Sequence, residues 1–218
     1  FDQVGIIRVE SKQLVLPIPM LRDANPNPWG YVEVERDRDG FLRRYGSVKT
    51  HLNEKILPLG METLRIALGI PRDSIIDMPR EIRFGDRIIP KYSPNTFMIN
   101  FNGPRSTFPE FNFSDVVDDA EYFTSSEDEE FEVNAFDDPD FGLLYQDVFR
   151  DKIVIVGATM PELQDFYATP YAANGNMPGY ETHANAMQTI LSGNAYQRVN
   201  NNNLLSVSLL TTALLVVI

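Results

Sequence analysis

Short apolar stretches with strand-like alternation occur over much of the first half of the chain. Within Gly30–Tyr45, Val32 and Val34 alternate with Tyr31, Glu33 and Glu35. Asp39-Gly40 then supplies residues that tolerate the positive φ of a tight turn. This pattern predicts a β-hairpin. Glu81–Pro90 predicts a second hairpin, and Thr96–Phe101 is an apolar stretch typical of a strand.

Helical spacing of apolar residues appears in two longer segments. Ile56–Leu68 is followed by Gly69, a typical helix stop. Tyr180–Ser192 is followed by Gly193. One side of this second helix is expected to carry Ala184, Met187, Ile190 and Leu191. A shorter helix is expected to start at Ser114–Val117, with Ser114 as its N-cap.

A continuous apolar run, Ile153–Val156, predicts a buried strand that breaks at Gly157-Ala-Thr159. In α/β proteins, ligands bind where such strands end. A phosphate cradle would need several spaced glycines or a Gly-Lys-Ser/Thr sequence, and this junction has one glycine. The junction is therefore interpreted as a turn at the end of a strand. Together the elements predict an α/β fold with a mixed sheet, flanking helices and β-hairpins.

The chain ends in a long apolar run, Leu204–Ile218, which contains 15 residues and no charge. A membrane-spanning helix needs roughly 20 such residues. We expect this run to be the start of a transmembrane helix. The alternative is a hydrophobic helix packed in the core. Residues 1–200 then form one domain outside the membrane.

Charge is distributed unevenly along the chain. The formal net charge is −12, yet residues 106–149 hold 14 acidic residues and no Lys or Arg. Within this region, 118–140 is predicted to be a solvated acidic insertion. A cation site in it is a second interpretation, although no regular calcium-binding loop is present. No basic face interleaved with aromatic residues indicates nucleic-acid binding.

Groups for nucleophilic catalysis are scarce, because the chain has no Cys and only two His. Glu181 and His183 lie at the start of the last predicted helix. Asp165 and Thr169 follow the predicted strand end, so all four could meet at one edge of the fold. Contact with a ligand is favoured over chemistry. The alternative is that Asp165 caps a turn and His183 satisfies a nearby carbonyl.

Three blocks of sequence resemble one known family. They are Asp37-Arg-Asp39-Gly40-Phe-Leu-Arg43, then Ile99-Asn100-Phe-Asn-Gly103-Pro104, and finally Asp151–Thr159 with Asp165, Thr169, Glu181 and His183. In this order and spacing the chain resembles type 2 CHASE domains, the cyclase/histidine-kinase-associated sensory extracellular domains. The family domain has an earlier α/β half, so this chain resembles its C-terminal part.

The resemblance implies a ligand-sensing domain outside the cytoplasm of a bacterial membrane receptor. The intracellular output would be an adenylate or guanylate cyclase, with a histidine kinase as the second choice. A cyclase output implies a homodimer. The partners expected are an unknown small ligand or ion and the membrane, with no cofactor, metal or nucleic acid.

The residues expected to bind ligand or to hold the motifs are Asp37, Asp39, Gly40, Arg43, Asn100, Gly103, Gly157, Thr159, Asp165, Thr169, Glu181 and His183. No catalytic residue is expected in the favoured interpretation. Two other functions remain open. One is a structural or dimerisation module of a membrane complex. The other is an extracytoplasmic enzyme that uses Asp165, Glu181 and His183 as acid–base groups.

Overall fold

A computed structural model describes residues 19–20, 29–51, 54–119, 121, 134–197, 199 and 201–217. The strands are β1 (Arg44–Gly46), β2 (Lys49–His51), β3 (Glu54–Ile56), β4 (Ile76–Asp77), β5 (Glu81–Phe84), β6 (Arg87–Pro90), β7 (Thr96–Met98), β8 (Phe166–Tyr167) and β9 (Met177–Pro178). The α-helices are α2 (Leu59–Ala67), α3 (Phe113–Val117), α4 (Gly179–Ser192) and α5 (Asn201–Val217). Short 3-10 turns occur at Arg72–Ser74, Pro161–Leu163 and Ala172–Asn174.

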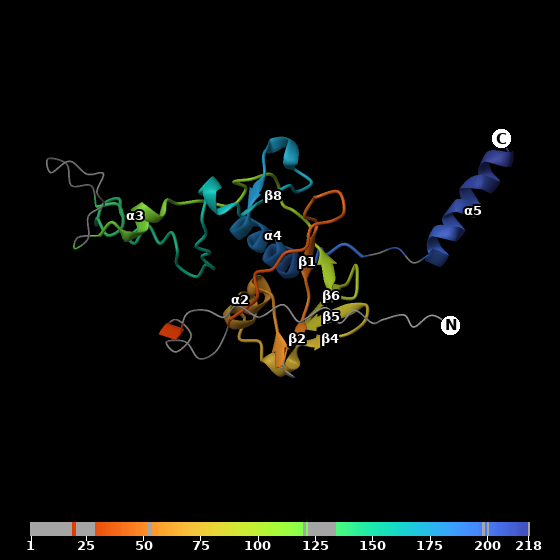
Figure 1. Ribbon diagram of the computed structural model, residues 1–218, viewed down its shortest axis with the longest axis horizontal. Coiled ribbons are helices and arrows are strands. Elements are labelled where there is room, and N and C mark those ends of the chain that lie inside the picture. The colour runs from red at the N-terminus through yellow and green to blue at the C-terminus, as the bar shows by residue number, and fades with distance from the viewer. Residues whose placement is uncertain are drawn as a thin grey trace, which may run out of the picture.

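Helix α4 occupies the centre of the molecule (Figure 1). It packs against α2 on one side, and the three-stranded sheet β4-β5-β6 lies below it in this view. The core consists of apolar residues from α2, α4 and the strands between them. Its largest fully buried side chains include Tyr45, Met61, Phe84, Phe97, Met177 and Ile190.

Both helices and the second hairpin confirm the sequence prediction. The bounds of α2 and α4 lie within three residues of the predicted ones, and Gly69 and Gly193 follow the helices with positive φ of 63° and 67°. β5 and β6 form the hairpin that turns at Gly85-Asp86. These elements depend on neighbouring residues in the sequence, so their local patterns suffice to predict them. Leu191 was wrongly placed on the buried face of α4, since its side chain is 39% exposed.

The first predicted hairpin is wrong in its pairing. Its turn forms, because Asp37 N–H donates to the Phe41 carbonyl at 2.8 Å. The strand after the turn, however, pairs antiparallel with β7, with Tyr45 opposite Phe97. Val32 is 62% exposed. Burial of both aromatic rings in the core favours the pairing of β1 with β7 over the pairing within the hairpin.

A single mixed sheet was also expected, and the described residues form four small antiparallel sheets instead. The predicted strand at Ile153–Val156 is absent from all of them. No backbone hydrogen bond joins its amides to another described residue, and Val156 is 73% exposed. Because an extended segment becomes a strand only next to a partner, its apolar sequence alone did not make it one.

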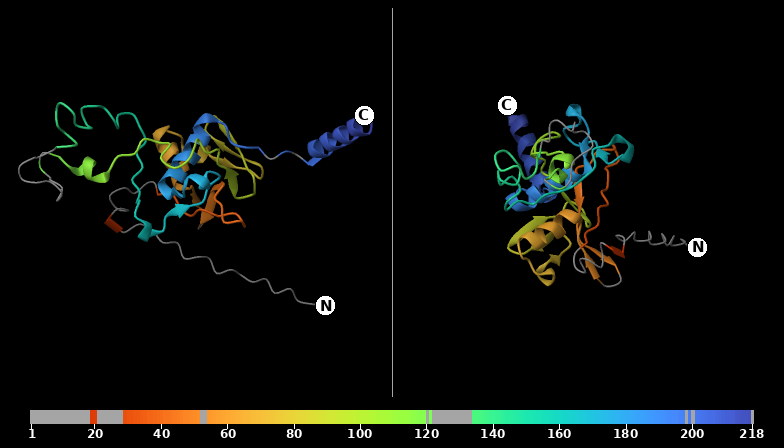
Figure 2. Two further views of the ribbon diagram at one scale, coloured as in Figure 1. Left: turned by 90° about the horizontal axis from the view of Figure 1, so that it is seen from above. Right: turned by 90° about the vertical axis from the view of Figure 1, so that its left-hand side faces the viewer.

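Two further expectations concern helix ends. Asn112, and not Ser114, is the N-cap residue of α3, since the helix begins at Phe113. α5 has 17 residues and stands apart from the rest of the molecule (Figure 2). Within the described part of the chain, no helix combines the length and the apolarity that crossing a membrane requires. The expected start of a transmembrane helix at Leu204 is thus not supported by this structure.

Most of the acidic insertion predicted at 118–140 lies outside the described residues. Its two ends are described, and they are bonded to each other. The Asp118 carboxylate accepts a hydrogen bond from Ala135 N–H at 3.0 Å, and the Asp118 carbonyl accepts one from Phe136 N–H at 2.9 Å. Asp118 is 4% exposed. This side chain closes the base of the insertion.

Candidate functional site

The N-terminal turn of α4 holds a neighbouring loop through one buried carboxylate. Glu181 is 1% exposed, and its two oxygens accept hydrogen bonds from the backbone amides of Ser106 and Thr107, both at 3.1 Å. A buried charge is costly without such partners. The amides therefore compensate the carboxylate, and the carboxylate fixes the loop against the helix.

The same face of α4 carries two more polar side chains at four-residue spacing. Asn185 Oδ1 accepts a hydrogen bond from Asn102 N–H at 2.9 Å, and Thr189 Oγ1 accepts one from Asn100 N–H at 3.0 Å. Asn185 also donates to the Glu181 carbonyl at 2.9 Å. Because residues four apart share a helix face, α4 binds the backbone of 100–107 along three turns. We call Glu181, Asn185 and Thr189 the polar stripe of α4.

The opposite side of α4 is joined to the rest of the core by His183. The Tyr45 hydroxyl accepts a hydrogen bond from Gly60 N–H at 2.9 Å and contacts His183 Nδ1. The amide supplies one donor, so the hydroxyl proton is free for the imidazole nitrogen. Burial lowers the pKa of His183, and the nearby Asp165 carboxylate acts in the opposite direction. The Tyr45 hydroxyl thus connects His183 of α4 to β1 and, through Gly60, to α2.

Asp165 lies against the first residue of α4. A Cβ added to Gly179 would approach its carboxylate oxygens to 2.2 and 2.3 Å. Gly179 N–H donates to the Asp165 carbonyl at 2.9 Å. The pKa of Tyr167 is raised by burial and by its interactions with Asp165. Asp165 therefore fits closely between the helix N-terminus and β8, which only a glycine at position 179 permits.

The junction after the predicted strand also packs on α4. A Cβ on Gly157 would lie 2.5 Å from Cβ of Tyr180, so this glycine allows close contact with the helix. Thr169 is fully buried, and its hydroxyl accepts a hydrogen bond from Tyr171 N–H at 3.3 Å in a local turn. Thr159 is exposed. The structure therefore brings Gly157 to α4 but leaves Thr159 on the surface.

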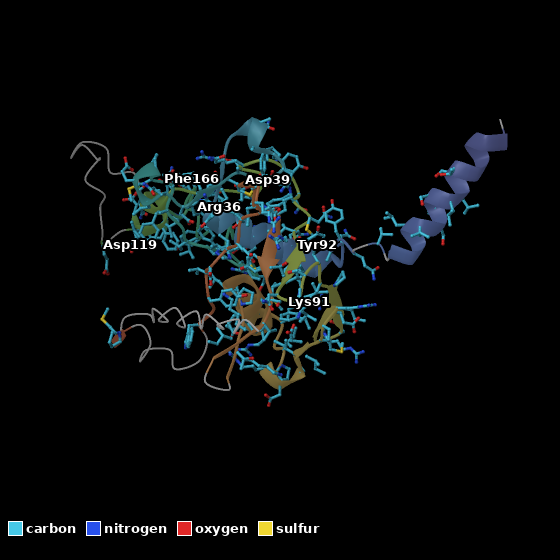
Figure 3. All side chains as sticks on the ribbon, turned by 45° about the vertical axis from the view of Figure 1, so that its right-hand side comes forward. Arg36, Asp39, Lys91, Tyr92, Asp119 and Phe166 are labelled. Carbon is cyan, nitrogen blue, oxygen red and sulfur yellow. The ribbon has the colours of Figure 1, made fainter. Side chains whose placement is uncertain are left out.

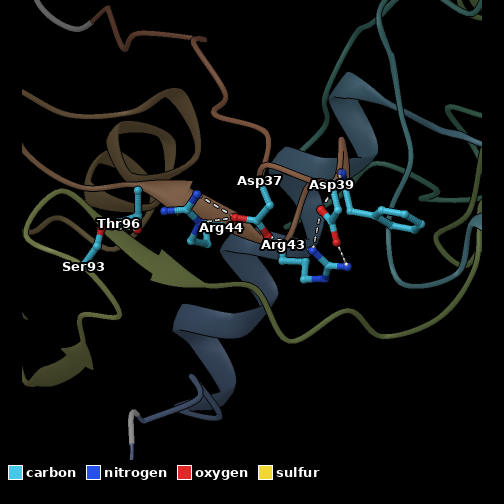
Figure 4. Close-up of polar contacts among 7 residues, drawn as sticks. Asp37, Asp39, Arg43, Arg44, Ser93 and Thr96 are labelled. Carbon is cyan, nitrogen blue, oxygen red and sulfur yellow. Dashed lines mark hydrogen bonds and ion pairs between the residues drawn. The ribbon is translucent and has the colours of Figure 1, made fainter.

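The Asp-x-Asp-Gly-x-x-Arg sequence folds into a compact ion-pair cluster, shown in Figure 4. Arg43 donates to Asp37 at 2.9 Å and to both oxygens of Asp39 at 3.0 and 2.8 Å. Arg44 donates to the other oxygen of Asp37 at 2.6 Å. Gly40 adopts a positive φ of 83° in the turn. These side chains satisfy one another, so the cluster is a brace for the turn.

This cluster is attached to the segment that carries Asp165. Leu42 N–H donates to the Ala168 carbonyl at 2.7 Å. The Arg36 guanidinium lies 5.1 Å from the centre of the Tyr167 ring. Arg36, Asp39 and Phe166 lie on the same side of the molecule in Figure 3. Two segments far apart in sequence thus form one surface beside α4.

Several site residues were missed from the sequence. Asn185 and Thr189 complete the polar stripe, and Tyr45 satisfies His183. The signal for the stripe was present, because Glu181, Asn185 and Thr189 recur every four residues in a predicted helix. Nothing in the sequence near Tyr45 indicates its partner 138 residues away.

Two of the side chains considered for acid–base chemistry, Glu181 and His183, already have hydrogen-bond partners within the protein. Both oxygens of Glu181 are occupied by backbone amides, and His183 Nδ1 is occupied by Tyr45. A general acid or base needs a free position facing a substrate. Among the described residues, no group of three or more His, Cys, Asp or Glu could hold a metal ion. In this structure Glu181 and His183 Nδ1 therefore make structural contacts within the protein.

The chain matches the CHASE2 domain over residues 4–218. The chain belongs to the CHASE2 family. CHASE2 domains are extracellular sensor domains. Neither a curated protein nor a solved structure matches the chain.

Proposed function

We propose that this CHASE2 chain is the ligand-sensing segment of a bacterial membrane receptor, located outside the cytoplasm, and that α4 transmits the signal. The observation that carries the proposal is the polar stripe of α4. It bonds to backbone atoms of 100–107, whereas His183 on the other side is bonded to Tyr45. A shift of either neighbour therefore changes contacts of the same helix.

α4 also leads directly to the apolar end of the chain. It ends at Ser192, and α5 begins at Asn201. The described side chains of α5, Leu204–Thr212, are all exposed and uncharged. No Lys or Arg follows Arg198. Because Lys and Arg are enriched on the cytoplasmic side of transmembrane helices, their absence here supports a position on the other side of the membrane. In this proposal α5 is the start of a transmembrane helix.

The proposed output is an intracellular adenylate or guanylate cyclase, and a histidine kinase is the second choice. Family membership supports a sensory role. A cyclase whose active sites form between subunits would require a homodimer. A ligand then acts by stabilising one of two arrangements of the domain, and only a difference in affinity between them produces a signal.

The transmitter role can be tested in the membrane-embedded receptor with Asn185→Ala. This change removes the hydrogen bond to Asn102 N–H. A net hydrogen bond is worth about 1 kcal/mol, which shifts a two-state equilibrium about fivefold. We expect basal output, measured as cyclic AMP, cyclic GMP and autophosphorylation, to change by up to about fivefold at equal receptor level.

Gln188→Ala is the matched control, because the side-chain amide of Gln188, also in α4, makes no hydrogen bond to another described residue. It should leave the output unchanged. If Asn185→Ala and Gln188→Ala both behave like the wild-type receptor, α4 does not transmit the signal.

Exposed apolar residues favour an assembly module as a second candidate. Ile153, Val154 and Val156 are 37%, 55% and 73% exposed. A thermal-shift screen of metabolites and ions, together with sedimentation analysis, separates the two candidates. A stable oligomer with no thermal shift from any compound would favour assembly over sensing.

A further inference from the structure

A surface hollow lies between the loop held by Glu181 and the segment before β8. Its volume is about 430 Å³, and it is lined by Arg105, Pro161, Gln164, Phe166 and Asn176. Cavities that hold small ligands have volumes of roughly 300–1,000 Å³. The Arg105 guanidinium lies 5.7 Å from the centre of the Phe166 ring. The hollow therefore combines one cation, two amides and an apolar wall.

Arg105 is not paired with a carboxylate in the described part of the chain. The nearby acids have other donors. Glu110 accepts from the Tyr180 hydroxyl at 2.8 Å and from the Ser106 hydroxyl at 3.0 Å, and Glu181 accepts from two amides. The Arg105 guanidinium is therefore available to an anion from outside the described residues. This guanidinium, which carries five N–H donors, lines the hollow.

Two residues beside the hollow adopt left-handed backbone conformations. Ser106 has φ of 63°, and Gln164 has φ of 53°. Such angles are uncommon for residues other than glycine. Glu181 holds the Ser106 amide in place, so the loop that presents Arg105 is fixed before any ligand arrives. Pre-organisation of this kind lowers the entropic cost of binding.

We infer that this hollow binds a small organic monocarboxylate, with its carboxylate on Arg105 and its apolar part against Phe166 and Pro161. The planar guanidinium matches two carboxylate oxygens at once. Gln164 and Asn176 can donate to or accept from a polar substituent on the same molecule. This inference rests on the proposed sensing function and names the class of ligand.

A phosphate is a poorer fit than a monocarboxylate. The carboxylates of Glu110 and Glu181 lie on the same loop and helix end, and one guanidinium does not neutralise a dianion in that setting. The apolar wall formed by Phe166 and Pro161 also gains more from a hydrocarbon body.

The hollow is connected to the transmitter helix through two consecutive residues. Arg105 lies next to Ser106, whose amide donates to Glu181 at 3.1 Å. A ligand that shifts Arg105 therefore also shifts Ser106 and changes its hydrogen bond to Glu181. This gives a direct route from the ligand to α4.

The test compares benzoate with its neutral isostere benzamide on the purified full chain, in a buffer free of phosphate and carboxylate. Binding is measured by saturation-transfer NMR. We expect benzoate to bind and benzamide to bind at least tenfold more weakly. Arg105→Gln should weaken benzoate roughly tenfold or more, because hydrogen bonds to charged groups carry most of the affinity. Arg105→Lys keeps the positive charge but lacks the paired N–H donors of the guanidinium. Its affinity for benzoate should lie between those of the wild type and Arg105→Gln.

Arg80→Gln is the control, since Arg80 is exposed in the turn before β5 and should leave binding unchanged. Thermal unfolding confirms that each variant is folded. Equal binding of benzoate and benzamide, no effect of Arg105→Gln, absence of benzoate binding at about 10 mM, or tighter Arg105-dependent binding of inorganic phosphate would each overturn the inference. None of these results bears on Asn185→Ala. Conversely, binding that depends on Arg105, together with no effect of Asn185→Ala on output, would support the carboxylate site and contradict signal transmission through α4.

Discussion

At the scale of single residues, the buried polar groups around α4 are paired across long distances in sequence. Glu181 pairs with amides 74 and 75 residues away, and His183 pairs with Tyr45. Buried polar groups are costly when they lack partners. Each of these residues therefore needs a second segment of the chain as its hydrogen-bond partner. A movement of either partner segment changes the contacts of the first turn of α4.

The protonation of His183 should make stability depend on pH. Its pKa is lowered in the folded protein by burial, with Asp165 and Tyr45 facing it. The unfolded chain has the ordinary value of about 6.5 and binds a proton first as pH falls. The stability from neutral His183 is therefore complete above about pH 6.5 and is lost as pH falls from there toward the folded pKa.

Urea unfolding at several values between pH 8 and pH 5.5 measures this effect, since most carboxylates remain ionised in that range. His183→Gln removes the titrating group and should flatten the dependence. An identical loss of stability in the wild-type chain and in His183→Gln would show that another group is responsible.

At the scale of elements, α4 is defined by its own sequence, whereas the segment Ile153–Val156 is not. The helix has a periodic pattern and a glycine stop, so its residues agree locally with one structure. The apolar segment has a strand sequence but no neighbouring strand in the part of the chain that the structure describes. A strand needs such a neighbour to satisfy its amides.

The exposed position of this segment predicts a small effect of truncation. Val156→Ala should change the free energy of unfolding by less than about 0.5 kcal/mol, because Val156 is 73% exposed. Ile82→Val removes less of the side chain but should cost about 0.5–1.5 kcal/mol, since Ile82 is fully buried in the core. Chemical denaturation of both variants gives the comparison. A larger loss for Val156→Ala would mean that this segment is a buried strand after all.

At the scale of the whole molecule, the hydrophobic core and the largest group of acidic residues come from different parts of the chain. The core is built from α2, α4 and the small sheets, and the acidic residues concentrate in 118–140. The described ends of that region are held together by Asp118 and Ala135.

Replacing residues 122–133 with four Gly and Ser residues should keep the fold. Because the ends are already bonded, the main change is a shorter loop, whose closure free energy differs by about 1 kcal/mol. Thermal and urea unfolding measure it. A variant of full length with the acidic residues changed to Asn and Gln separates the effect of charge from that of length. A loss well above 3 kcal/mol on shortening would show that these residues stabilise the core.

The turns, α2, α4 and the β5–β6 hairpin could be predicted from the sequence, because each is decided by residues close in the chain. Asp165, Thr169, Glu181 and His183 were grouped from their positions after a predicted strand and at the start of a predicted helix, and the other site residues came from the family resemblance. The hydrogen-bond partners of these residues were not predicted. Only the tertiary structure decided that β1 pairs with β7, that Glu181 holds the loop carrying Arg105, and that Val156 stays exposed. The physical reason is that hydrogen bonds and burial between distant segments depend on which surfaces meet, and local periodicity holds no information about that choice.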